Sequence, residues 1–207
     1  MLSFFKKNPG DVKNNAESIT NLSKHLARNA IRNCNEDYES WSKFDSGLAL
    51  VQLTSDEIFE GSYYFWTFNL SLAYVCLLKN GKEYGDKTIS DFVEPVFSKI
   101  YLQSKSFFIQ YIKEDLGINY FTFELPPDEV VLDRVTMLVG LPVMVENNLS
   151  FDQTSSIGEN YSKYIAVVNL KPDVMMRQAI FNGALRSIER IMPIYAGAFK
   201  MMRDNIR

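Results

Sequence analysis

The chain has 207 residues and carries 22 Lys+Arg against 25 Asp+Glu, for a net charge of −3. Its 46% hydrophobic and 23% charged content is typical of a globular protein and excludes an extensively disordered one. The acidic balance also speaks against broad binding to nucleic acid, which needs a positive surface field. We expect residues 1–10 to be a flexible tail and residues 11–207 to form a single globular domain.

The first predicted helix follows the breaker Pro9-Gly10, where Asp11 is placed to cap it. The only histidine, His25, flanks its apolar stripe and is expected at the surface or at the boundary of the core. The stripe recurs at helical spacing and consists of Ala16, Ile19, Leu22, Leu26 and Ala30. A later stretch, residues 47–53, is ambiguous between helix and strand, and a strand is favoured.

A long apolar helix is predicted next, over residues 58–78. Thr54 and Glu57 have the spacing of a capping box at its start, and Lys79-Asn80-Gly81 resembles a C-cap. The segment is long enough to span a bilayer, but Glu60 and Asn69 would be costly to bury in lipid. A central buried helix is therefore favoured over a membrane span.

Aromatic residues are concentrated in this helix, and two roles are open for them. They fill the core, with Trp66 and Phe68 expected to be buried, or they line a cavity for an apolar ligand. The set comprises Tyr63, Tyr64, Phe65, Trp66, Phe68 and Tyr74.

The rest of the chain alternates predicted helices with predicted short strands. A helix over 91–116 starts with Glu94 as its cap and Pro95 as its first residue, and a second helix runs from Pro126 to Gly140. Strands are predicted at 119–124, 142–146 and 164–170, and a final helical region at 173–207 is broken at Pro193. The predicted fold class is helix-rich α+β, with long helices packed around a small sheet of three or four short strands.

Motifs that would carry chemistry are weak in this sequence. Residues 81–88 approach the spacing of a phosphate-binding loop, but Asp86 stands at the second glycine position and would repel a phosphate. His25 and Cys34 are nine residues apart, about 13 Å along a helix, which is too far for a direct catalytic pair. A single histidine also excludes the metal sites built from histidine pairs. We therefore assign no catalytic residue, no metal site and no cofactor, although a carboxylate-based active site stays open.

The C-terminal region is the best candidate for a binding surface on sequence grounds. Five of the chain's eight methionines lie there, on more than one helical stripe, together with several basic residues. Flexible thioethers with a charged rim suit a surface that docks a partner protein. The predicted contact residues are Met192, Phe199, Met202 and Arg203.

These observations favour a non-catalytic protein-interaction module: an adaptor, an inhibitor or immunity-type protein, or a chaperone for a specific partner. Only two cysteines, Cys34 and Cys76, occur, which fits free thiols in a reducing compartment, so a cytoplasmic location is expected. The alternative is a small enzyme or binding protein for an apolar ligand held by the aromatic helix 58–78. A third hypothesis, association with a membrane through that helix or through the Phe4-Phe5-Lys6-Lys7 tail, is disfavoured.

Overall fold

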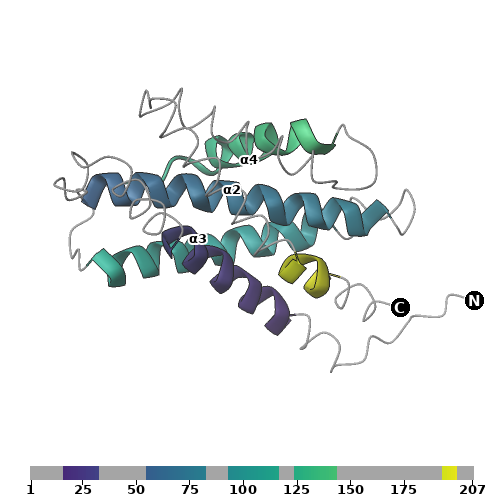
Figure 1. Cartoon of the computed structure of the whole chain (residues 1–207), viewed down its shortest axis with the longest axis horizontal. Coiled ribbons are helices and arrows are strands. Elements are labelled where there is room, and N and C mark those ends of the chain that lie inside the picture. The colour runs from purple at the N-terminus through teal and green to yellow at the C-terminus, as the bar shows by residue number, and fades with distance from the viewer. Residues whose placement is uncertain (1–15, 33–54, 83–92, 117–123, 144–192, 200–207) are drawn as a thin grey trace, which may run out of the picture.

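The computed structural model describes residues 16–32, 55–82, 93–116, 124–143 and 193–199 (Figure 1). Within these ranges 95% of the residues are helical and no strand is present. The predicted helix-rich α+β fold, with its small sheet of three or four short strands, is therefore wrong for the described residues, which are all-α. The predicted strands at 47–53 and 164–170 lie outside the described residues.

The other two predicted strands meet the edges of described segments. Pro142 and Val143, predicted to begin a strand, are instead the last residues of helix α4, Asp128–Val143. Glu124, predicted to end a strand, lies in the stretch 124–127, which is neither helix nor strand and leads into α4. A short apolar run has no clear period of its own, so the helix that precedes Pro142 decides its conformation.

The central element is α2, Ser55–Lys82, with α4 above it and α3 below it in the view of Figure 1. Helix α3, Glu94–Leu116, runs antiparallel to α2. This direction follows from the ring contacts: Phe59 near the start of α2 meets Phe108, whereas Tyr74 further along meets Phe97. The helix at 16–32 lies below α2, and the short helix at 193–199 lies near the later part of α2.

Helix α2 is surrounded because its sequence is apolar around its whole circumference. Its side chains from Ser62 to Leu77 are buried, except for the partly exposed Tyr74. Trp66 and Phe68 are both 0% exposed, which confirms the prediction made for them. A helix without a polar face must be covered on every side. Among the described elements, α3 and α4 both pack against it. No described helix combines the length and the apolar content needed to cross a lipid bilayer.

The boundaries of α3 agree with the predicted ones, whereas α2 and α4 begin and end two to four residues away from theirs, and α4 continues past Gly140. α2 begins at Ser55, next to the predicted cap, but it continues through Gly81 to Lys82 instead of ending at Leu78. α3 begins at Glu94 with Pro95 in its first turn, as predicted. Glycine after an apolar run thus did not stop α2, because the tertiary context can override a local end signal.

Small hydroxyl residues lie where the helices approach one another closely. Ser23 Oγ donates to the carbonyl of Ile19 one turn back, at 2.8 Å, and lies 3.4 Å from the carbonyl of Ile100 on α3. On the other side of the bundle, Ser71 Oγ lies 3.3 Å from the carbonyl of Val135 on α4. These contacts place helix 16–32 against α3, and α2 against α4. They also satisfy hydroxyl groups that would otherwise be buried at a cost.

Candidate functional site

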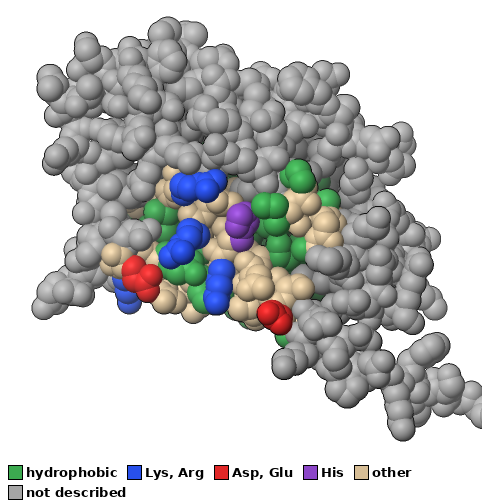
Figure 2. All heavy atoms as spheres, turned by 60° about the horizontal axis from the view of Figure 1, so that its bottom comes forward, with side chains coloured by type: hydrophobic (Ala, Val, Ile, Leu, Met, Phe, Trp, Pro, Cys, Tyr) green, Lys and Arg blue, Asp and Glu red, His purple; other side chains and the backbone are tan. Residues whose placement is uncertain are grey.

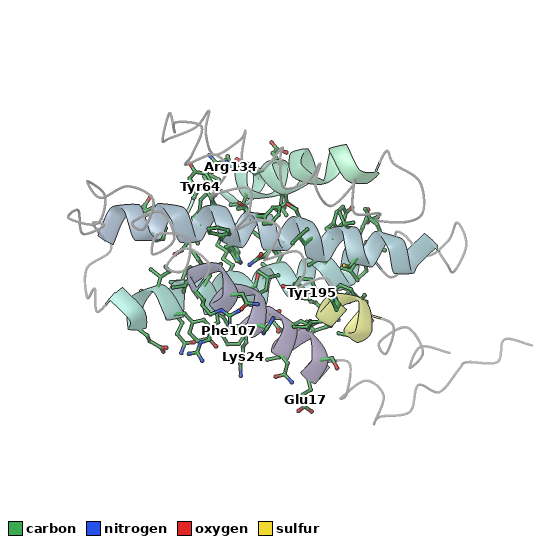
Figure 3. The ribbon with its side chains drawn as sticks, viewed as in Figure 1. Glu17, Lys24, Tyr64, Phe107, Arg134 and Tyr195 are labelled. Atoms are coloured by element: carbon green, nitrogen blue, oxygen red, sulfur yellow. The ribbon has the colours of Figure 1, made fainter. Side chains whose placement is uncertain are left out.

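The most distinctive surface of the described structure combines two exposed cations with two aromatic rings. Lys24 Nζ lies 5.3 Å from the centroid of the Phe107 ring, and Arg28 Cζ lies 4.6 Å from that of Tyr111. The two rings stack on each other, with centroids 6.0 Å apart and an interplanar angle of 17°. Figure 3 shows Lys24 and Phe107 together at the lower edge of the bundle. We call these four residues the basic–aromatic face.

This face exists because two helices present the same spacing to each other. Lys24 and Arg28 are four residues apart on helix 16–32, and Phe107 and Tyr111 are four residues apart on α3. Side chains at that spacing lie on one side of a helix, so each cation meets one ring when the helices cross. Such a pair contributes about 0.5–1 kcal/mol at an exposed site, and it restricts where the cation can move.

The charges of the basic–aromatic face are available to a ligand. Lys24 and Arg28 are exposed, and no carboxylate among the described residues forms an ion pair with either of them. Figure 2 shows Lys and Arg side chains gathered on this side of the molecule, with acidic side chains at the edges, one of them beside a basic side chain. Glu17 and Glu114 are exposed on the two contributing helices.

His25 lies beside this face as a partly buried residue. Its Nε2 is 2.7 Å from Asn29 Nδ2, so in this arrangement the ring nitrogen accepts and the ring proton sits on Nδ1. Burial, and then the nearby positive charge of Arg32, lower the pKa of His25 below its ordinary value of 6.5. The partly buried position of His25 agrees with the predicted position at the boundary of the core.

A second cluster of ionisable groups joins α3 to the start of α4. The Tyr101 hydroxyl donates to Asp128 Oδ1 at 2.6 Å, and Lys105 forms an ion pair with the same oxygen. Tyr101 and Lys105 are one turn apart on α3, while Asp128 is the first residue of α4. We call these three residues the α3–α4 junction.

The chemistry of the α3–α4 junction is that of a structural tie. Burial, and then the hydrogen bond to Asp128, raise the pKa of Tyr101 well above its ordinary value. Hydrogen bonds from Lys105 and then Tyr101 lower the pKa of Asp128. A tyrosine that acts as a base needs the opposite shift. Asp128 also complements the positive end of α4, as expected for an acidic residue in a first turn.

The aromatic residues of α2 pack against rings of neighbouring helices. Trp66 stacks on Phe108, with centroids 5.1 Å apart and an interplanar angle of 11°, and on Tyr101 at 6.0 Å. On the α4 side, the Arg134 guanidinium lies 5.3 Å from the centroid of Tyr63, and Figure 3 shows Arg134 close to Tyr64. Because protein side chains occupy these positions, the contacts support the core role for the aromatic helix and add nothing for an apolar ligand.

The predicted C-terminal docking surface is represented by one described residue. Phe199 is 0% exposed, so its side chain belongs to the core and is not available for a partner to contact. Met192, Met202 and Arg203 lie outside the described residues. Tyr195, one turn before Phe199, is also buried, and burial raises the pKa of its hydroxyl far above the ordinary value. Figure 3 shows Tyr195 directed toward the bundle.

The weak motifs of the sequence gain no support from the described part of the chain. Gly81, the first glycine of the phosphate-loop-like stretch, is helical within α2, and residues 83–88 lie outside the described residues. Cys34 also lies outside them, so a pairing with His25 is not tested. Among the described residues, no group of three His, Cys, Asp or Glu side chains is arranged to hold a metal ion.

Sequence reasoning missed the basic–aromatic face. The available signal was the four-residue spacing of Lys24, Arg28 and Arg32 along one helix.

Comparison of the whole chain with protein-family models, with curated proteins and with solved structures gave no match, so no family is assigned.

Proposed function

We propose that this protein is a non-catalytic protein-interaction module that binds an acidic segment of another protein on its basic–aromatic face. The observation that carries this proposal is the pair Lys24 and Arg28: both are exposed, each lies over a ring of α3, and neither has an ion-pair partner among the described residues. An adaptor role in the cytoplasm, as expected from the sequence, is part of the proposal.

The chemistry of the face favours carboxylates as its ligands. A guanidinium stacked on an aromatic ring keeps the N–H groups at its edge, where a carboxylate can accept two hydrogen bonds. Because the Tyr111 ring already restricts Arg28, less side-chain freedom is lost when a ligand binds. Lys24 adds a second positive charge one turn away. Together they can bind a pair of neighbouring acidic side chains.

The surroundings of the face favour a short acidic segment over an extended polyanion. Glu17 lies on helix 16–32 before Lys24, and Glu114 lies on α3 beyond Tyr111; both are exposed. A long phosphate backbone or an anionic membrane would come near these carboxylates and be repelled. The net charge of −3 for the whole chain also disfavours binding of an extended polyanion.

The buried position of Phe199 also bears on the choice of surface. The C-terminal docking hypothesis counted this residue as an apolar contact, but its side chain is enclosed by the core. A role for Met192, Met202 and Arg203 in docking stays a prediction about residues outside the described ranges. The described residues thus give more support to the basic–aromatic face.

Affinity capture from the source cell, carried out with matched charge variants, tests this function. The wild-type protein should capture a partner that the double variant Lys24→Glu/Arg28→Glu loses. The control Lys99→Glu makes the same kind of charge change at an exposed position two turns before Phe107 on α3, and it should keep the partner. The captured protein, once purified, should bind less tightly as salt is raised. The same captured proteins with all variants would refute the proposed surface.

A further inference from the structure

The two cations of the basic–aromatic face are held at a set spacing. Lys24 and Arg28 are separated by four residues, which corresponds to about 6 Å along the axis of an α-helix. The rings beneath them, Phe107 and Tyr111, have centroids 6.0 Å apart. Since each cation lies over one of these rings, the two positive charges repeat at nearly the spacing of one helical turn. A partner that uses both charges must present its carboxylates at the same spacing.

The backbone of helix 16–32 restricts what kind of segment can lie on it. All amide and carbonyl groups in the interior of a helix bond within that helix, so they offer nothing to an added strand. An extended peptide laid along this surface would leave its own backbone groups to water or unpaired. A helical peptide satisfies its backbone internally, and its side chains at four-residue spacing form a ridge that can align with the Lys24–Arg28 row.

We infer that the acidic segment bound by the basic–aromatic face is an α-helix with two carboxylate side chains four residues apart. This inference rests on the proposed function and adds the conformation and register of the partner. One carboxylate lies at Arg28 and accepts from its guanidinium, and the other lies at Lys24. The partner is a different protein; a second copy of this chain is the alternative occupant, because α4 carries the exposed pair Glu129 and Asp133 at the same spacing.

The decisive probes are two synthetic peptides of equal composition, each about 15 residues long so that a helix can form. One carries its two glutamates at i and i+4 in an alanine- and glutamine-rich helix. The other carries them at i and i+2, on nearly opposite sides of the helix. Fluorescence anisotropy with a labelled peptide measures the affinity for the full-length protein at low salt. The i,i+4 peptide should bind about fivefold more tightly than the i,i+2 peptide, a ratio equivalent to one exposed ion pair of about 1 kcal/mol.

Variants of the protein test whether that preference comes from the face. Arg28→Glu should remove the difference between the two peptides, whereas Lys99→Glu should preserve it. Tyr111→Leu keeps the charge and an apolar side chain but removes the ring, and it should weaken the i,i+4 peptide about two- to fivefold. Circular dichroism of each variant confirms that the helices persist. An unchanged affinity in Tyr111→Leu would overturn the idea that the ring positions Arg28.

The outcomes separate this inference from the function on which it rests. Equal affinity for both peptides, with partner capture still dependent on Lys24 and Arg28, would overturn the helical register but not the proposed function. If neither peptide binds, and if partner capture does not change when Lys24 and Arg28 are replaced, both the helical register and the proposed function are overturned. Sedimentation velocity of the protein alone tests the alternative occupant. Self-association that is abolished by Arg28→Glu and also by Asp133→Lys would show that the face binds a second copy, and would overturn the inference.

Discussion

Trp66 offers the most direct test of the helical core because several contacts meet on one side chain. It is 0% exposed, stacks on Phe108 at 5.1 Å and on Tyr101 at 6.0 Å, and donates from Nε1 to Ser104 Oγ at 3.2 Å. Trp66→Ala should lower the free energy of unfolding by about 3–5 kcal/mol from lost burial and the cavity left behind. The ring pairs, at about 0.5–1.5 kcal/mol each, place the expected loss at the upper end.

Urea unfolding followed by circular dichroism measures this loss, and a double-mutant cycle isolates the hydrogen bond. Ser104→Ala alone leaves the buried indole N–H without its acceptor, which should cost about 1–3 kcal/mol. In the Trp66→Phe background the same change should cost clearly less, since no indole donor is left. Leu102 lies on α3, as Ser104 does, and its side chain is 59% exposed. Leu102→Ala should therefore change the free energy of unfolding by no more than about 0.5 kcal/mol. A loss below about 1 kcal/mol for Trp66→Ala would refute the central position of α2.

Three further predictions concern ionisation and the C-terminal helix. Because hydrogen bonds from Lys105 and Tyr101 lower the pKa of Asp128 below 3.8, its contribution to stability is present above that pH and is lost as the pH falls through the folded-state value. Asp128→Asn should therefore unfold with a weaker dependence on acid, and identical acid titrations of the two proteins would contradict this. Burial lowers the pKa of His25, so the unfolded chain binds this proton first and stability should fall as the pH drops below 6.5. His25→Gln, which keeps an acceptor for Asn29, should show a shallower slope in urea titrations between pH 7 and pH 5, about the range in which histidine titrates, and an equal slope would argue against it. Phe199→Ala should cost about 3–5 kcal/mol in urea unfolding, whereas a surface docking residue would leave stability nearly unchanged.

The helices with long and regular apolar patterns could be predicted from the sequence. The helices predicted over 58–78 and 91–116 are confirmed as α2 and α3, and the burial of Trp66 and Phe68 followed from the apolar content of residues 58–78. Short segments were less reliable. The strand predicted at 142–146 is wrong at its start, because Pro142 and Val143 complete α4, and a run of five residues is too short to show a clear period of either kind.

The basic–aromatic face could not be predicted from the sequence, because its residues come from two helices. Lys24 and Phe107 belong to different helices, and a helical pattern states which residues share a face but not which other helix that face meets. The same holds for Tyr101 and Asp128, whose hydrogen bond joins α3 to α4. Side-chain contacts of this kind depend on the crossing of two helices.

The sequence by itself determined the composition class, the positions of the long helices and the identity of the most buried one. These properties depend on spacing within a continuous segment, and apolar burial supplies the driving force for all of them. The tertiary structure decided that Phe199 is enclosed and that Lys24 and Arg28 stack on Phe107 and Tyr111. Exposure and cation–ring contact are properties of two or more segments brought together, so they exist only once the helices have packed.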